Sequence, residues 1–133
     1  LEENPYRSVA TIPTHDMATL RGWWDEDAER TQRFYNYMLQ KDGDAPHPMP
    51  GWLCEEVVAR HLFCPSMLCL LSLQDWLSMD EQLRYPDADF ERINVPANPR
   101  HYWRYRMHLT IEQLMEQPAL NEKILNLIKR SGR

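Results

Sequence analysis

His15 and Asp16 are the neighbouring side chains in this sequence whose types best suit chemistry on a polar substrate. An imidazole can donate a hydrogen bond or move a proton, and a carboxylate accepts hydrogen bonds and stabilises positive charge. The pair follows residues 8–12, a small, β-branched and apolar run that predicts a strand, and Pro13, which ends it. Because α/β barrels hold polar working groups at the carboxyl ends of their strands, the pair is a candidate site.

The residues after this pair predict two helices on either side of a loop. The first helix covers 20–40, with acidic residues 25–27 near its start, where the helix dipole favours negative charge. Residues 41–51 contain three prolines and two glycines and predict the loop. The second helix covers 52–63, with apolar residues along one side.

The second half of the chain predicts one more strand and two more long helices. Residues 67–73 are continuously apolar, as in a strand that is covered on both faces of a parallel sheet. Residues 84–99 contain prolines and predict a loop, and Asn98-Pro99 at its end favours a helix over 99–108. A final amphipathic helix is predicted over 118–130.

The order of strand, helices, strand and helices predicts an α/β fold that is mostly helical by residue count. Two parallel strands joined through helices make one βαβ unit. A complete (β/α)₈ barrel requires about 250 residues, so this chain of 133 residues is too short to close one.

Composition argues against several classes of function. The chain has 43% hydrophobic and 26% charged residues, which is the composition of a globular domain. Its net charge of −5, without a basic stripe, argues against nucleic acid as a partner, and no apolar stretch approaches the ~18 residues of a membrane span. Three cysteines without a CxxC pair favour free thiols in the cytoplasm and disfavour a zinc site.

Four segments of the chain share their pattern with one enzyme family. They are residues 14–24, with Thr-His-Asp and Leu-Arg-Gly-Trp-Trp, and residues 66–75, 92–96 and 103–106. In order, they resemble the segment at the seventh barrel strand, the eighth strand with its turn, the late substrate loop and the closing helix of the 4-α-glucanotransferases (amylomaltase or disproportionating enzyme, glycoside hydrolase family 77). They are similar to the larger branch that includes plant cytosolic enzymes, although Ala97 stands where common bacterial members have glycine.

The resemblance implies that the chain is the C-terminal part of a (β/α)₈ barrel, with about its last two strands and their helices. It implies an enzyme that transfers α-1,4-glucan segments between maltodextrins, or to glucose, by a retaining double displacement. Such an enzyme uses a carboxylate nucleophile and a carboxylic acid/base roughly 5–5.5 Å apart, with no metal or organic cofactor. Both groups belong to earlier strands in the family, so this chain alone is expected to be inactive.

By the same resemblance, three residues of this chain would bind the glucan. Asp16 would be a third carboxylate, which holds sugar hydroxyls at the cleavage subsite and stabilises the oxocarbenium-like transition state. His15 would donate a hydrogen bond to that sugar, and Asn94 would contact glucose units further along the donor chain. The expected partners are α-1,4-glucans and maltooligosaccharides of starch and maltodextrin metabolism.

Several other polar or aromatic residues have two interpretations. Trp23 and Trp24 could stack on sugar rings, or pack in the core. Arg21 could reach a substrate hydroxyl, or form a salt bridge between a helix and a loop. Gln74-Asp75 could line the site, or cap the turn that follows them. Glu55-Glu56 are adjacent on one helix and point apart, which favours a solvated face over a pair of catalytic acids.

Two other hypotheses compete with the barrel fragment. A non-catalytic helical binding or interaction module predicts a stable monomer without a large exposed apolar face. The barrel fragment predicts unpaired strand edges at 8–12 and 67–73, through which the chain could self-associate. A small independent hydrolase is the weakest hypothesis, because few carboxylates lie outside the predicted helices.

Overall fold

The sheet of this protein has two short parallel strands, and both of its outer edges are unpaired. A computed structural model describes all 133 residues. Strand β1 (Val9–Ala10) pairs with β2 (Leu68–Cys69), in a register that places their first residues opposite each other. The apolar stretches 8–12 and 67–73 are therefore longer than the segments that pair.

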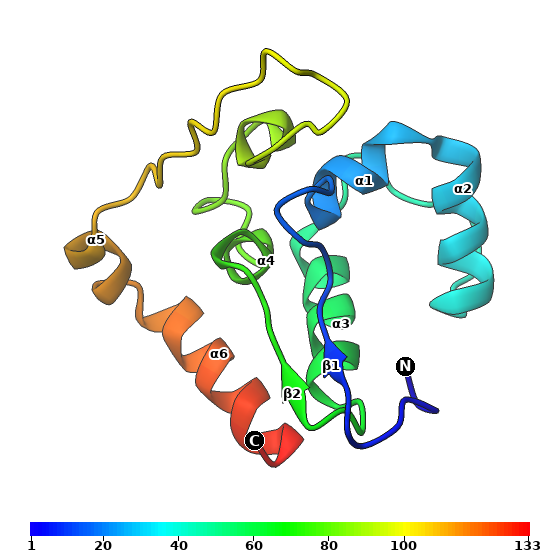
Figure 1. The fold of residues 1–133 in the computed structure, drawn as a ribbon. Helices are drawn as coiled ribbons and strands as arrows, with labels where there is room; N and C mark the ends of the chain where they lie inside the picture. Colours follow the sequence, from blue (N-terminus) through cyan, green and yellow to red (C-terminus); the bar gives the residue numbers. More distant parts are fainter.

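The remaining elements are six α-helices and two single turns of other helix types. They are α1 (Leu20–Glu26), α2 (Ala28–Arg33), the π-helical turn η1 (Phe34–Met38), α3 (Gly51–Leu62), α4 (Leu73–Ser78), the 3-10 turn η2 (Ala88–Glu91), α5 (Ile111–Met115) and α6 (Pro118–Ser131). In Figure 1, α3 lies behind the strands, with α1 and α2 on one side and α4 and α6 on the other. The structure is thus mostly helical with a small parallel sheet, which is compatible with part of an α/β fold.

Helix α3 lies at the centre of the hydrophobic core. Its side chains Leu53 and Val58 are fully buried, as are Trp24 from α1 and Met49 from the loop before α3. The Trp24 indole nitrogen donates a hydrogen bond to the Pro46 carbonyl at 2.8 Å. The polar edge of this buried ring is therefore satisfied, and its apolar surface packs edge-on against Phe34 and Tyr35 of η1.

The helix that the sequence predicts over 20–40 is interrupted at Asp27. The Asp27 side chain accepts a hydrogen bond from the Arg30 amide at 2.9 Å and caps α2. Its own backbone is extended (φ −151°, ψ 98°), so α1 ends at Glu26. The reason is that a short acidic side chain can bind nearby amides and start a new helix, which the apolar periodicity does not reveal.

The prediction of a helix over 99–108 is wrong. Asn98 makes only a single turn, in which its side chain accepts a hydrogen bond from the Arg100 amide at 3.0 Å. Its carbonyl accepts one from the His101 amide, also at 3.0 Å. After that turn the chain has no regular secondary structure until α5.

We call residues 92–109 the strap (yellow to gold in Figure 1). Its side chains and carbonyls bind other parts of the molecule, and this replaces the hydrogen bonds of a helix. Within the strap, His101 Nε2 lies 2.8 Å from the Ile93 carbonyl. From outside the strap, the Tyr85 hydroxyl donates a hydrogen bond to the Arg106 carbonyl. Long-range contacts of this kind override the local helical preference of the segment.

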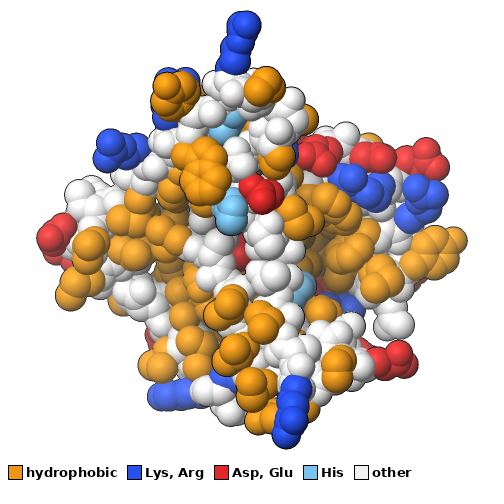
Figure 2. Space-filling model, viewed as in Figure 1, with side chains coloured by type: hydrophobic (Ala, Val, Ile, Leu, Met, Phe, Trp, Pro, Cys, Tyr) orange, Lys and Arg blue, Asp and Glu red, His pale blue; other side chains and the backbone are white.

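Large apolar side chains remain exposed around the sheet. Hydrophobic side chains spread over much of the face in Figure 2. At and beside the strands, Val9, Leu68 and Leu70 are about half exposed, at 54%, 47% and 59%. In α/β proteins such side chains are covered by a neighbouring layer, which this chain does not supply. None of the helices has both the length and the apolar composition that a membrane-spanning segment requires.

Candidate functional site

His15, Asp16 and Asn94 lie together in the folded chain. Asn94 Nδ2 donates a hydrogen bond to Asp16 Oδ1 at 2.7 Å, although the two residues are 78 positions apart. His15 Nε2 lies 3.5 Å from the same carboxylate oxygen. The side chains of His15 and Asp16 are 52% and 53% exposed, so both can reach a ligand in solvent. The arrangement offers a carboxylate, an imidazole and an amide on one open surface.

The turn between β1 and α1 carries His15 and Asp16. The Met17 amide donates to the Thr14 carbonyl at 3.0 Å, which closes the turn around the pair. Thr19 then caps α1 by accepting a hydrogen bond from the Gly22 amide at 3.3 Å. Because a strand ends before the pair and a capped helix starts after it, the pair sits on a short, defined connection.

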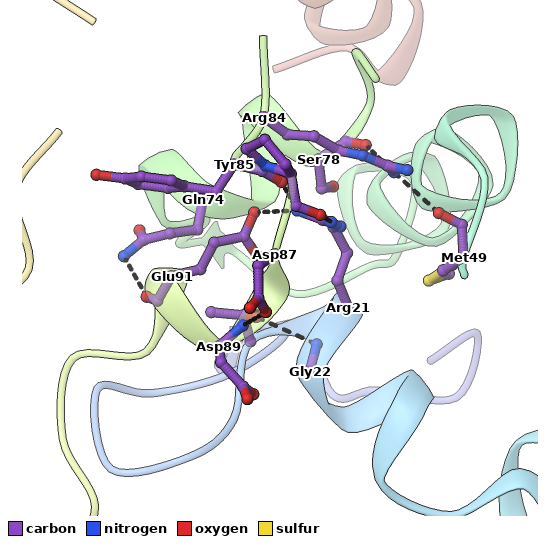
Figure 3. A network of polar contacts seen from close by, with 12 residues as sticks. Arg21, Gly22, Met49, Gln74, Ser78, Arg84, Tyr85, Asp87, Asp89 and Glu91 are labelled. Carbon is purple, nitrogen blue, oxygen red and sulfur yellow. Dashed lines mark hydrogen bonds and ion pairs between the residues drawn. The ribbon is translucent and has the colours of Figure 1, made fainter. Parts of the chain in front are cut away.

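A buried ion pair joins the beginning of α1 to the end of η2. Arg21 Nη1 lies 2.5 Å from Glu91 Oε1, and both side chains are only 3% exposed. The same guanidinium donates to the Tyr85 carbonyl at 2.7 Å and to the Pro86 carbonyl at 3.2 Å. Figure 3 shows Arg21 and Glu91 facing each other within this network.

Two further side chains hold Glu91 in place. Thr19 Oγ1 donates to Glu91 Oε2 at 3.1 Å, and Gln74 Nε2 donates to the Glu91 carbonyl at 3.2 Å. We call Arg21, Glu91, Thr19 and Gln74 the clamp. Asp16 lies shortly before Arg21 in the chain, and Asn94 lies shortly after Glu91. The clamp therefore fixes the two loops whose side chains meet in the site.

Burial changes the pKa of the clamp carboxyl. It raises the pKa of Glu91 above its ordinary value, and the nearby Arg21 charge and hydrogen bond act in the opposite direction. Because so little water reaches the pair, removing either partner would leave an uncompensated charge inside the protein.

The structure decides between the alternatives for the other candidate residues. Arg21 forms the salt bridge between helix and loop, and it is too buried to reach a substrate. Trp24 is fully buried in the core. Trp23 is partly buried and lies under the Arg30 guanidinium, 4.6 Å from the ring centroid to Cζ. Asp75 caps α4.

Trp103 is the site residue that the sequence did not single out. Its ring centroid lies 5.0 Å from that of His15, with 49° between the ring planes, and the residue is 61% exposed. Sequence reasoning placed residues 103–106 in a helix, where the direction of this ring could not be derived. The signal available was a tryptophan in a polar, proline-flanked segment.

The site is open to solvent. A cleft of about 60 Å³ next to His15 is lined by Pro13, Thr14, His15, Met17, Thr19, Ser72, Gln74, Glu91 and Ile93. Asp16, Asn94 and Trp103 do not line this cleft. A larger hollow of about 720 Å³ lies elsewhere, among the first residues, η1 and α3. No group of three or more His, Cys, Asp or Glu side chains is arranged to hold a metal ion.

Asp75 is a buried carboxyl in the first turn of α4 that serves the fold. Its Oδ2 accepts hydrogen bonds from the amide and the hydroxyl of Ser72, both at 2.8 Å, while Ser72 Oγ accepts from the Asp75 amide at 3.2 Å. This capping box begins α4. The residue is 1% exposed, and its Oδ1 has no hydrogen-bond partner. Burial raises the pKa of Asp75, and the bonds from Ser72 oppose this.

The raised pKa of Asp75 predicts a pH dependence of stability. The stabilisation that comes from protonating this carboxyl is fully present below the unfolded pKa of about 3.9 and is lost as the pH rises through the folded pKa. We therefore expect the natural protein to gain stability relative to an Asp75→Asn variant as the pH falls from neutral toward that value. Chemical denaturation at each pH measures the difference, and a difference that stays constant would contradict the prediction.

Comparison with known proteins finds relatives over most of the chain. The family model described as 4-alpha-glucanotransferase matches residues 1–111. The chain is 36% identical over 128 residues to 4-alpha-glucanotransferase DPE2 of Oryza sativa subsp. japonica, which covers 96% of the chain. It is 23% identical over 133 residues to a 4-alpha-glucanotransferase of Chlamydia caviae, and 26% identical over 117 residues to one of Chlamydia trachomatis serovar D, covering 92% and 86% of the chain.

The chain spans only a small part of these relatives. The matches cover 14% of the rice protein and 23% and 21% of the two chlamydial proteins.

Proposed function

The chain belongs to the 4-alpha-glucanotransferase family, and we propose that it is the C-terminal part of the catalytic (β/α)₈ barrel of such an enzyme. In this proposal β1 and β2 are the last two barrel strands. Their parallel pairing and the helices that join them support the proposal, as do the exposed apolar side chains around the sheet. A self-contained binding module would have covered those side chains.

The proposed reaction moves α-1,4-glucan segments from one maltodextrin to another, or to glucose, with retention of configuration. Two carboxyl groups outside this chain act as nucleophile and as acid/base. Asp16 accepts hydrogen bonds from sugar hydroxyls at the point of cleavage. As positive charge develops on the sugar ring, the Asp16 carboxylate stabilises it electrostatically.

His15 and Asn94 complete this part of the proposal. His15 donates a hydrogen bond to the same sugar. Asn94 holds Asp16 through Nδ2 and offers its carbonyl oxygen to the next glucose unit of the donor. The observation that carries the proposal is the 2.7 Å hydrogen bond between Asn94 and Asp16, because it joins two residues assigned to one glucan site from distant segments.

The test is an assay of maltotriose disproportionation by the full-length protein and by the 133-residue chain alone. We expect the full-length protein to produce glucose together with maltooligosaccharides longer than maltotriose, as separated by anion-exchange chromatography. We expect the chain alone to produce neither, because it lacks the two carboxyl groups of the displacement. Transfer by the chain alone, or none by the full-length protein, would overturn the proposal.

The proposal has two further parts. The enzyme works in the cytoplasm, where the three free cysteines stay reduced. Isolated from its parent, the chain self-associates through the open edges of its sheet.

A further inference from the structure

Trp103 is an exposed aromatic residue beside the candidate site. A large aromatic side chain is normally buried, because its surface contributes strongly to the core. Trp103 is instead 61% exposed, and the contact that it makes with another ring is with His15. His15 is next to Asp16, and Asp16 is bonded to Asn94. An exposed indole therefore borders a carboxylate, an imidazole and an amide.

The strap fixes the position of this indole from both sides. Before Trp103, the His101 ring is bonded to the Ile93 carbonyl at 2.8 Å. After it, Tyr105 packs edge-on against Tyr85, with 6.3 Å between ring centroids. These contacts hold the backbone on either side of residue 103 and so position the exposed ring beside His15.

We propose that the Trp103 indole is a stacking platform for an α-linked glucose residue in the site of His15, Asp16 and Asn94. A pyranose ring has an apolar face of C–H groups, which packs on an aromatic face, and hydroxyls around its edge. A sugar ring that stacks on this indole would direct its hydroxyls toward the polar side chains beside the indole. Ligand sites commonly combine an apolar surface with a few polar groups in this way. The inference rests on the proposed function and names a further residue that contacts the glucan.

Tyr102 provides a matched control within the strap. It precedes Trp103 directly, is 74% exposed and makes no aromatic contact with the site residues. A general effect of removing an exposed aromatic ring from the strap would appear equally at either position. A platform at Trp103 predicts an effect at that position alone.

The experiment measures binding of a thio-linked maltotriose, which binds but resists transfer, to the full-length protein. We expect Trp103→Leu to raise the Kd at least tenfold, or about 1.4 kcal/mol. Trp103→Phe keeps an aromatic face and is expected to raise it less than threefold, and Tyr102→Leu less than twofold. Ligand binding is also expected to change the tryptophan fluorescence of the natural protein, with that change lost in Trp103→Phe.

The outcomes separate the inference from the proposed function. If the natural protein transfers glucan and Trp103→Leu binds the ligand within twofold of it, the platform is wrong while the function stands. A fall in kcat with unchanged Kd and fluorescence would also overturn the platform, because the indole would then only position His15. Failure of the natural protein to bind and to transfer would overturn the proposed function itself.

Discussion

Replacing Asp16 by asparagine in the full-length protein is expected to lower the rate of glucan transfer by at least about 100-fold. The change removes the negative charge and keeps the shape of the side chain. The Asp16 side chain is 53% exposed, and its polar contacts are with the side chains of His15 and Asn94. Stability is therefore expected to change by less than about 0.5 kcal/mol. The loss would come from the transition state, where the charge on the sugar ring is no longer balanced.

Steady-state kinetics with maltotriose measures this effect. A carboxylate that acts in the transition state lowers kcat more than it changes KM. Asp42→Asn is the matched control, because Asp42 is an exposed aspartate in the loop before α3. We expect that variant to keep the natural rate. An Asp16→Asn enzyme with more than a tenth of the natural rate would contradict the proposed role of this carboxylate.

Replacing Arg21 by methionine is expected to destabilise this part of the protein by about 3–5 kcal/mol. The substitution keeps much of the volume and leaves the Glu91 carboxyl buried without its partner. The Tyr85 and Pro86 carbonyls lose their donor in the same step. Native-state hydrogen exchange of the α1 and η2 amides in the full-length protein measures the loss locally, without requiring the whole protein to unfold in one step.

A surface ion pair provides the control for this prediction. Arg33 and Glu29 on α2 are 4.0 Å apart, and their side chains are 65% and 85% exposed. Arg33→Met is expected to cost less than about 1 kcal/mol, because water replaces the lost pairing. A double variant, Arg21→Met with Glu91→Leu, is expected to recover part of the stability, since it leaves no buried charge. Equal exchange in the Arg21 and Arg33 variants would show that the clamp does not hold α1 to η2.

The sequence contains most of the local information about this fold. Apolar runs indicate the two segments that contain the strands, and the pattern after Pro118 indicates the last helix. Local patterns fail where a side chain starts a competing structure, as Asp27 does within 20–40. They also fail at 99–108, where Arg106 and His108 bind Tyr85 and Leu83 in place of forming a helix.

In the candidate site, too, some features could be predicted from the sequence and others could not. His15 and Asp16 are adjacent, so the sequence shows them together. Asn94 was predicted to be a site residue only from the resemblance to a family, because nothing near it in the sequence indicates contact with Asp16. Glu91 and its partner Arg21 are 70 positions apart, and a lone glutamate carries no local mark of burial. The direction in which the Trp103 ring points depends on the path of the strap, and that path has no helical or strand periodicity from which it could be predicted.

The hydrogen bond from Asn94 to Asp16 also determines which hydrogen-bonding groups of a ligand these two side chains can bind. The side-chain amide of Asn94 points its hydrogen at the carboxylate, which leaves its side-chain oxygen Oδ1 and Asp16 Oδ2 free to bind a ligand. Both oxygens are hydrogen-bond acceptors, so a ligand must supply an O–H or N–H donor to bind them. A methyl ether of the same sugar cannot donate to these two oxygens, so we expect it to bind more weakly than the free hydroxyl.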